Sequence, residues 1–554
     1  MDAANIASHL PAMARRQPHT AAVVFPAGRD RAGRVAYTHY TFAQLDRESD
    51  LLARGLLDAG IGPGVRTVLM VKPSLDFFAL TFALFKARAV PVLIDPGIGV
   101  KNFGKCVNEA EPGAFIGIPL AHVARLALGW GRRTLRTLVT VGPKCWGGLT
   151  LAELRQRGLA AGNLALPATT PADLAAILFT SGSTGPPKGV VYTHGIFTDQ
   201  VAKLRQLYGI QPGEIDLPTF PLFALFAPAL GMTAIIPDMD FTRPAQVDPV
   251  KILEAVENFG VTNMFGSPAL INRLGRHGAT HGSRMPSLRR VISAGAPVAA
   301  SVLERFTRML PADAQVFTPY GATESLPVTS IGSAEILGET RHRTAQGAGV
   351  CVGKPVPGIT LRIIRIIDEP IAIWSDSLVL PVGEIGEIAV RGDNVTREYF
   401  QRPDHTARAK IPDPASGGFY HRMGDVGYLD ASGRVWFCGR KAHRVITSRG
   451  TLFTIPCEAI FNTHPAVFRT ALVGVACAGE TQPVLCVELE PTSPGDPAPN
   501  HAQLRQELLA LGAANPLTRD IRTILFHPAF PVDIRHNAKI FREKLAVWAA
   551  QRMP

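Results

Sequence analysis

The sequence predicts an α/β fold in which parallel sheets are flanked by helices. Before about residue 350, apolar strand-like runs alternate with amphipathic helix-like runs, which is the rhythm of α/β domains. After that point the pattern changes to short strands separated by Gly-Pro turns. The chain has 554 residues, more than one hydrophobic core usually supports. We therefore predict a large domain of layered α/β sheets with a β-rich subdomain at about 350–440.

The individual elements follow from the spacing of apolar residues. Residues 41–60 repeat apolar side chains at helical spacing and end at Gly60. The expected helices cover 41–60 and 73–90, and the expected strands cover 66–71, 90–95, 288–298 and 314–324. Strand, helix and strand in this order predict parallel pairing, with the last two strands running into loops.

Composition excludes several classes of protein. The formal net charge is +12, but no tight Lys/Arg block occurs, so we predict an electropositive site for small anions or a merely basic surface rather than nucleic-acid binding. The seven cysteines are scattered without a CxxC pair, which predicts neither a disulfide framework nor a zinc site. The first twenty residues contain no apolar core of a signal peptide. Together these features predict a cytoplasmic protein.

One uncharged stretch, 217–237, has the length of a membrane span. Four prolines interrupt it, at positions 218, 221, 228 and 237, and each removes a helical hydrogen-bond donor. We therefore predict no transmembrane segment. The stretch is expected to form ordinary core or the wall of an apolar pocket, with Phe220, Phe223, Phe226 and Met232 as candidate lining residues.

A loop of small residues lies between two apolar runs at 177–195, ILFTSGSTGPPKGVVYTHG. Its glycines, Gly182, Gly185 and Gly189, can expose backbone N–H groups. Hydroxyl donors come from Ser181, Ser183 and Thr184, and a positive charge comes from Lys188. This combination is typical of a polyphosphate site, although the spacing is not that of a Walker A loop. The alternative is a flexible surface loop.

The segment 180–189 resembles the phosphate loop of the adenylate-forming superfamily, and the further motifs of that family occur in order. SAGAPV (293–298) resembles the segment that lines adenine, and YGATES (320–325) resembles the YGxTE motif. HRMGDVGYLDASGRVWFCGR (421–440) resembles the TGD…GR motif. PVDIRHNAKI (531–540) lies where the family carries its C-terminal lysine, although Ala538 replaces the usual glycine before Lys539. The resemblance covers nearly the whole chain.

The resemblance implies a reaction, its cofactors and a division of the chain. A carboxylate attacks the α-phosphorus of ATP, pyrophosphate leaves and an acyl-AMP forms, with ATP and Mg²⁺ required. Residues 1–440 are expected to form the adenylation domain, and residues 441–554 a small mobile α+β domain that carries Lys539. The expected catalytic residues are Lys539, Thr323 and Glu324, with Glu324 as the Mg²⁺ ligand.

The same resemblance assigns the nucleotide contacts. The phosphates are expected to bind Thr180, Ser181, Gly182, Ser183, Thr184, Gly185 and Lys188. Adenine and ribose are expected to contact Gly295, Ala296, Pro297, Tyr320, Gly321, Asp425 and Arg440. Within these sets, Tyr320 is expected to stack on adenine, and Asp425 and Arg440 to bind the ribose hydroxyls.

Departures from the commonest family pattern distinguish the branches. Acyl-CoA synthetases usually carry PLFH where this chain has PLFALF, with Ala224 in place of the histidine. Ala442 stands at the hinge position that is usually Asp or Lys. Three stretches, 236–249, 340–358 and 533–545, instead resemble the β-lactone synthetase branch found in bacterial long-chain olefin biosynthesis. The alanines at positions 224 and 442 both weaken the case for thioester chemistry, which needs a large rotation at the hinge.

That branch implies a long-chain 2-alkyl-3-hydroxyalkanoic acid as substrate. After adenylation, the substrate's own 3-hydroxyl would attack the acyl carbon, giving a β-lactone and AMP. A base would help to remove the hydroxyl proton, and His194 and His421 are the candidates, although His194 could instead cap the next helix. Assembly with other olefin-biosynthesis enzymes is implied by the resemblance alone. The alternatives are a long-chain fatty acyl-CoA ligase and a non-catalytic nucleotide-binding protein.

Overall fold

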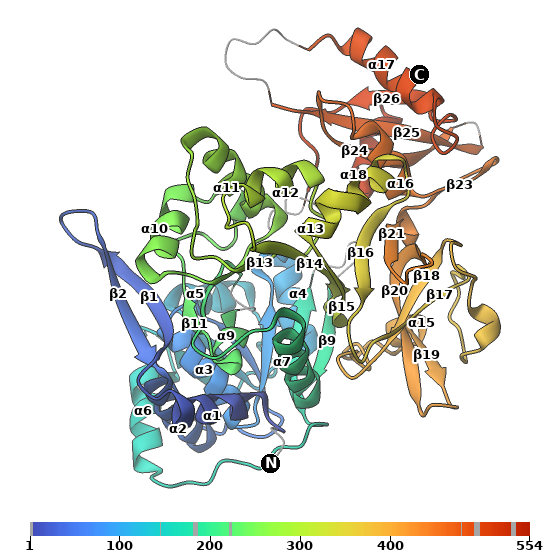
Figure 1. Cartoon of the computed structure of the whole chain (residues 1–554). Coiled ribbons are helices and arrows are strands. Elements are labelled where there is room, and N and C mark those ends of the chain that lie inside the picture. Colours follow the sequence, from blue (N-terminus) through green and yellow to red (C-terminus); the bar gives the residue numbers. More distant parts are fainter. Residues whose placement is uncertain are drawn as a thin grey trace.

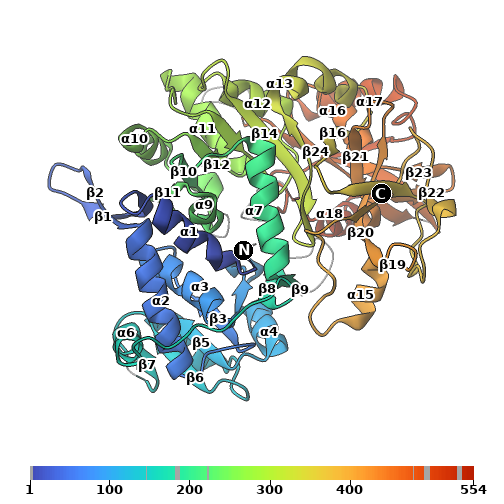
Figure 2. The same ribbon diagram turned by 60° about the horizontal axis from the view of Figure 1, so that its bottom comes forward.

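The structure is a computed structural model that describes residues 4–144, 146–180, 187–220, 224–477, 479–491, 499–532 and 539–553, without the side chains of Pro96 and Thr180. Two large mixed sheets form the body of the molecule (Figure 1). Two smaller sheets belong to the C-terminal part, which lies beside β16 and β21 in both views (Figures 1 and 2). The predicted α/β architecture is confirmed.

The seven-stranded sheet contains the predicted early strands in a mostly parallel arrangement. Its order is β7 (Leu149–Thr150), β6 (Thr137–Thr140), β5 (Ala114–Gly117), β3 (Arg66–Met70), β4 (Val90–Ile94), β8 (Leu174–Thr180) and β9 (Lys188–Thr193). All neighbours pair in parallel except β8 and β9, which are antiparallel on either side of the small-residue loop. The loop therefore connects two adjacent strands at one end of the sheet.

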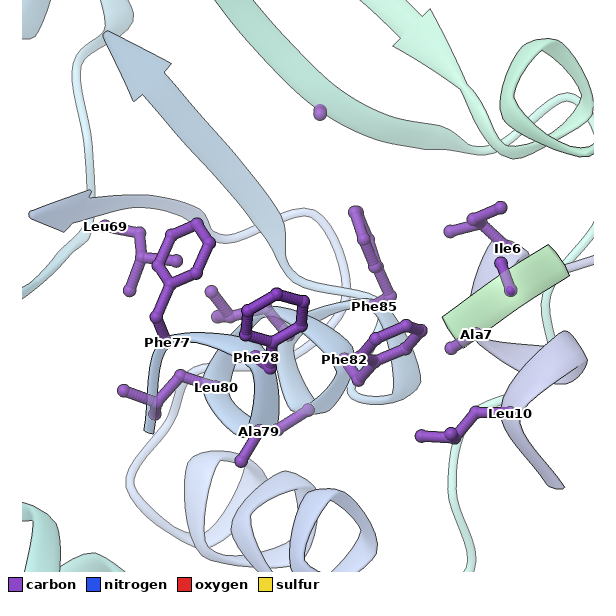
Figure 3. Packing of buried hydrophobic residues seen from close by; sticks show 14 of the residues in the cluster. Ile6, Ala7, Leu10, Leu69, Phe77, Phe78, Ala79, Leu80, Phe82 and Phe85 are labelled. Carbon is purple, nitrogen blue, oxygen red and sulfur yellow. The ribbon is translucent and has the colours of Figure 1, made fainter. Parts of the chain in front are cut away.

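Helices cover both faces of this sheet. The helices α2 (Phe42–Asp58), α3 (Leu75–Lys86) and α6 (Leu151–Ala160) pack in one apolar cluster, and α4 (Val100–Ala110) and α5 (Pro119–Leu128) contribute to another. A capping box between Thr41 and Gln44 begins α2, so the predicted helix is confirmed within two residues at each end. Figure 3 shows Phe82 and Phe85 of α3 on the side of Ile6 and Leu10, and Phe77 near Leu69 at the other end of the helix.

The fourteen-stranded sheet joins the rest of the large domain to the β-rich subdomain. Its order is β17 (Thr360–Ile364), β18 (Gly386–Arg391), β20 (Gly418–Leu429), β21 (Val435–Arg440), β16 (Val350–Pro355), β15 (Ser325–Gly332), β14 (Gln315–Ala322), β13 (Arg290–Ile292), β12 (Asn263–Phe265), β10 (Ile215–Pro218), β11 (Thr233–Ile235), β1 (Ala21–Arg29) and β2 (Val35–Thr41), with β19 (Lys410–Asp413) paired to β20. The predicted strands near 290 and 316 are confirmed as β13 and β14. The β-rich character after residue 350 is confirmed as well.

The remaining helices pack around these strands. They are α1 (His9–Arg16), α7 (His194–Tyr208), α9 (Phe226–Leu230), α10 (Pro249–Phe259), α11 (Pro268–His281), α12 (Ala300–Thr307), α13 (Ser333–Glu335), α14 (Arg341–Ala345) and α15 (Pro403–Ala409). The described part of the uncharged stretch 217–237 is divided among β10, α9 and β11, with Pro218 at the end of β10 and Pro237 after β11. Among the described residues, no helix is both long and apolar enough to cross a membrane.

The C-terminal part has its own α+β core. It contains β22 (Val445–Thr447), β23 (Gly450–Leu452), α16 (Thr454–Phe461), β24 (Val467–Cys477), β25 (Glu480–Leu489), α17 (His501–Ala513), β26 (Thr523–Phe526) and α18 (Arg542–Ala550). A buried ion pair between Arg542 and Glu458 ties α18 to α16. Strand pairing changes between the end of β21 and the start of β22, where the proposed domain boundary at 440/441 lies.

Candidate active site

A cavity of about 1580 Å³ lies where the two large sheets and the C-terminal part meet. Its wall includes the predicted residues Lys188, Phe220, Phe226, Met232, Gly295, Gly321, Thr323, Glu324, Arg440 and Lys539. Tyr320 and Asp425 lie directly behind this wall, whereas Ala296 and Pro297 follow Gly295 on the same loop. Ser181, Gly182, Ser183, Thr184, Gly185 and Phe223 lie outside the described residues, and of Thr180 only the backbone is described. The structure thus brings residues of distant motifs to one cavity.

Lys188 begins β9 at the end of the small-residue loop. Its Nζ atom lies 5.1 Å from the ring centroid of Tyr399, a cation–π distance. Burial lowers the pKa of Lys188, while the carboxylate of Glu324 acts in the opposite direction. The next residue must be small, because a Cβ on Gly189 would lie 2.8 Å from the ring of Phe179. Lys188 is therefore held at the start of a tightly packed strand.

Glu324 is fixed in the turn between β14 and β15. The hydroxyl of Tyr399 donates a hydrogen bond of 2.6 Å to Glu324 Oε1, and the backbone N–H of Thr396 donates one of 2.9 Å to the Glu324 carbonyl. The hydroxyl of Tyr192 donates a 2.5 Å hydrogen bond to the carbonyl of Thr323. Burial raises the pKa of Tyr399, so its hydroxyl keeps the proton that it donates. One carboxylate is thus presented to the cavity in a defined position.

Tyr320, Asp425 and Arg440 form one buried constellation. The Tyr320 hydroxyl donates a 2.7 Å hydrogen bond to Asp425 Oδ2, and Arg440 Nη1 lies 3.0 Å from Asp425 Oδ1. Asp425 and Arg440 face each other across the antiparallel pair β20–β21. Burial raises the pKa of Asp425, and the charges of Arg440 and Lys539 oppose that shift. The motif residues therefore meet because strand register places them opposite one another.

Lys539 reaches the cavity from the C-terminal part. Its neighbour Ile540 forms an isolated bridge with Val532, and Lys539 itself lines the cavity. Its charge acts on Asp425. The C-terminal part is therefore oriented with this lysine turned toward the residues of the large domain.

The two candidate histidines lie in different surroundings. His194 is the first residue of α7, after the N-cap Thr193, and its Nδ1 accepts a 3.4 Å hydrogen bond from the N–H of Ile6. It packs against Phe85, and burial lowers its pKa to about 4. His194 is not the N-cap of α7, because Thr193 holds that position. It also lies outside the cavity wall, so it does not fit the role of ring-closing base. His421 does line the cavity, and burial holds its pKa well below the ordinary value.

The sequence did not single out a buried polar pair in the apolar part of the wall. Asp216 on β10 and Asn263 on β12 are adjacent in parallel register, and Asn263 Nδ2 donates a 2.5 Å hydrogen bond to Asp216 Oδ1. Both are almost fully buried, and both line the cavity. Burial raises the pKa of Asp216 to about 7. No strand was predicted at either position, so the sequence carried no signal for this pair.

Replacing Asp216 with asparagine is expected to stabilise the protein more at high pH than at low pH. The ordinary pKa of 3.8 is raised to about 7, so the folded state binds a proton that the unfolded chain releases between those values. Stability of the wild type therefore falls as pH rises through that window. Between about pH 5.5 and about pH 8.5, the advantage of Asp216→Asn should grow by about 2 kcal/mol. Urea unfolding of the wild type and the variant at both pH values measures the difference in their free energies of unfolding. The same difference at both pH values would contradict the raised pKa of Asp216.

The hinge position is flanked by ion pairs. Ala442 lines the cavity, and the neighbouring Lys441 Nζ lies 3.2 Å from Glu387 Oε2. Arg422 Nη2 lies 2.6 Å from the same oxygen of Glu387, and Arg422 and Glu387 are both almost fully buried. Arg444, two residues beyond Ala442, pairs with Asp368 at 3.0 Å. The hinge is therefore held to the β-rich subdomain on both sides in this orientation.

These features define an enzyme site in which lysines and one carboxylate lie in the same cavity as a large apolar pocket. The AMP-binding enzyme family model matches residues 10–400, so the chain belongs to that family of adenylate-forming enzymes. It is 53% identical to the olefin beta-lactone synthetase of Xanthomonas campestris pv. campestris, over 99% of this chain and 98% of that protein. It is 54% identical to the olefin beta-lactone synthetase of Stenotrophomonas maltophilia, with the same coverage.

Solved structures with low identity share the fold. The amide bond synthetase McbA from Marinactinospora thermotolerans superposes with a TM-score of 0.78 at 23% sequence identity, covering 98% of this chain and 99% of that chain. This likeness extends over both the large domain and the C-terminal part. It confirms the predicted fold class.

Proposed function

We propose that the protein is an ATP-dependent β-lactone synthetase acting on long-chain 2-alkyl-3-hydroxyalkanoic acids. The observation that carries the proposal is the single cavity in which Lys188, Glu324 and Lys539 share a wall with the apolar residues Phe226 and Met232. An anionic reactant and a long apolar substrate can meet there. Identity of 53–54% over nearly the full length to enzymes named olefin beta-lactone synthetases supports the substrate class.

In the proposed first step, the substrate carboxylate attacks the α-phosphorus of ATP and pyrophosphate leaves. Lys188 and Lys539 supply positive charge for two anionic reactants that would otherwise repel each other. Thr323 is proposed to contact the α-phosphate, Tyr320 the adenine, and Asp425 with Arg440 the ribose. The loop residues from Thr180 to Gly185, together with Gly295, Ala296, Pro297 and Gly321, are proposed to complete the nucleotide contacts.

Mg²⁺ fits the donor set at Glu324. Mg²⁺ is usually bound by one or two carboxylates together with substrate phosphates rather than by a cage of protein ligands. Among the described residues, no group of three or more His, Cys, Asp or Glu side chains forms such a cage. Glu324 presents one carboxylate, fixed by Tyr399. When bound, the ion would neutralise phosphate charge; Glu324 would hold it.

In the proposed second step, the substrate closes a ring on itself. The oxygen of the 3-hydroxyl forms a bond to the acyl carbon, the bond from that carbon to the phosphate oxygen breaks, and AMP leaves with the electron pair. The hydroxyl proton passes to a base, for which His421 is the histidine candidate that faces the cavity. The walls align the hydroxyl with the carbonyl and limit competing attack by water.

The remaining assignments concern the setting of the reaction. We propose that residues 1–440 form the adenylation domain and residues 441–554 a mobile cap. A cytoplasmic location is supported by the six described cysteines, none of which forms a disulfide within the described chain. Association with other enzymes of olefin biosynthesis is proposed from the resemblance to that branch of the family. Mixing with candidate partner enzymes and measuring mass by light scattering tests the association.

A product assay tests the proposed activity. The purified protein is incubated with ATP, Mg²⁺ and a synthetic long-chain 2-alkyl-3-hydroxy acid, with and without CoA, and the organic extract is examined by proton NMR at low temperature. We expect the ring protons of a β-lactone in equal amount with and without CoA, because the acceptor is the substrate's own hydroxyl. A thioester formed only with CoA would instead assign the protein to the acyl-CoA ligases.

A further inference from the structure

The cavity reaches both faces of the seven-stranded sheet. Successive residues of a strand point to opposite faces, and on β3 both Val68 and Leu69 line the cavity. The same is true of Val92 and Leu93 on β4. Core packing agrees, because Val68 and Val92 belong to the cluster of α4 and α5, whereas Leu69 and Leu93 belong to the cluster of α3. The cavity therefore extends around the ends of these strands into two arms.

The inner arm lies between the two large sheets. Its wall is apolar and comes from β3, α3, α7, α9 and the residues on either side of β11. The residues that define it are Leu69, Phe77, Phe197, Leu204, Phe226, Met232 and Ile236. Most of them are buried in the main core. Figure 3 labels two of them, Leu69 and Phe77, at one end of α3. This arm is therefore lined largely by side chains of the main core.

The outer arm lies beneath α4 and α5. The residues that define it are Val68, Val92, Phe103, Ala121, Ala124, Leu128 and Trp130. It differs from the inner arm at its far end, because Val100, Leu120 and Leu128 line the cavity and are also 62%, 71% and 52% exposed. Large apolar side chains at such exposure on one surface usually mark a binding site. The outer arm therefore opens to the surface through an apolar rim.

We propose that the two arms hold the two alkyl chains of the substrate, one chain in each arm, with the carboxyl group at their junction beside Thr323 and Lys539. The proposal rests on the proposed substrate class. The two chains of a 2-alkyl-3-hydroxy acid leave neighbouring carbons, so each needs its own channel close to the reacting carboxyl. Burial of each methylene of an alkyl chain stabilises the complex, so excluding a long chain from its arm should weaken binding of the acid strongly.

The apolar rim follows from the same arrangement. A chain longer than the outer arm continues over the exposed rim residues Val100, Leu120 and Leu128 instead of ending in a closed wall. The inner arm has no such rim among the residues that define it, so it limits chain length more sharply. The two arms are expected to differ in the length of chain that they accept.

The test narrows each arm separately and uses two acids that each carry one long chain. One acid has a long 2-alkyl group and a methyl group on C3; the other has a methyl group on C2 and a long chain on C3. Ala124→Phe narrows the outer arm and Leu204→Trp the inner arm, both at half-buried positions. Val123→Phe is the matched control, because Val123 is exposed on α5 and is not part of the cavity wall.

Pyrophosphate release is the readout, since it reports adenylation whatever the final product. Each arm variant is expected to raise KM at least tenfold for one of the two acids and less than twofold for the other. The acid that Ala124→Phe impairs should be the one that Leu204→Trp leaves nearly unchanged, and the reverse. Turnover of a short 3-hydroxy acid and the Tm verify that each variant is folded. Equal impairment of both acids by both variants, or no impairment by Ala124→Phe, would overturn the two-arm assignment. If the proposed function is wrong but the arms are assigned correctly, each variant would still raise KM for a different acid, but no lactone would form.

Discussion

Replacing Lys539 with alanine is expected to slow acyl-adenylate formation by about 100- to 1000-fold. The lysine lines the cavity, and its charge reaches Asp425. Negative charge grows on the phosphate oxygens as the carboxylate attacks, and a fixed ammonium group stabilises that charge more than it stabilises the separated reactants. The effect should therefore fall on kcat/KM for pyrophosphate release, measured with saturating ATP.

A nearby lysine supplies the control for this experiment. Lys544 on α18 is exposed, and its Nζ lies 4.6 Å from the ring of Phe541 rather than in the cavity. Lys544→Ala should release pyrophosphate at nearly the wild-type rate. Adenylation at the wild-type rate in Lys539→Ala would remove the catalytic role that we assign. Equal losses in both variants would indicate a general effect on the C-terminal part.

Local sequence signals predicted several of the elements well, because these depend on near neighbours. The helix α2 is an example: its apolar spacing and its capping pair Thr41 and Gln44 are all within one segment. The resemblance to the family motifs made Lys188, Glu324, Asp425 and Arg440 candidates before their geometry was known. Strand register then explains why Asp425 and Arg440 meet.

The residues that sequence reasoning missed are those whose role depends on distant pairing. Tyr399 reaches Glu324 and Lys188 because an isolated bridge joins it to Val190 on β9, more than two hundred positions earlier. The Asp216–Asn263 pair arises from the parallel register of β10 and β12. No periodicity within one segment encodes either contact. The second alkyl arm is hidden for the same reason, because it combines both faces of a sheet.

The hinge illustrates a further limit. The sequence showed that Ala442 is uncharged, which weakens the case for a rotation driven by that residue. The structure adds that Lys441 and Arg444, on either side, are paired with Glu387 and Asp368. Glu387 would keep its buried partner Arg422 if Lys441 moved away, and the pair of Arg444 with the exposed Asp368 is a surface pair of small energy. These pairs hold the hinge in the present orientation and do not by themselves oppose a rotation.

Replacing Glu324 with glutamine is expected to lower adenylation by about 100- to 1000-fold and to raise the Mg²⁺ concentration needed for half-maximal rate. Glutamine has nearly the same shape and can still accept the hydrogen bond from Tyr399, which is 2.6 Å in the wild type. The substitution therefore removes the negative charge with little change to the packing. Hard cations such as Mg²⁺ need that charge more than they need an oxygen atom.

Tyr399→Phe separates the charge of Glu324 from its orientation. This variant keeps the carboxylate and the ring that faces Lys188 but removes the hydroxyl donor. Its loss of adenylation should be about 10- to 100-fold, which is the value of one hydrogen bond to a charged group. Titrating Mg²⁺ against pyrophosphate release in the wild type and both variants gives the comparison. If Glu324→Gln keeps the wild-type Mg²⁺ dependence, the carboxylate does not hold the ion, and its place beside Tyr399 and Lys188 would be structural.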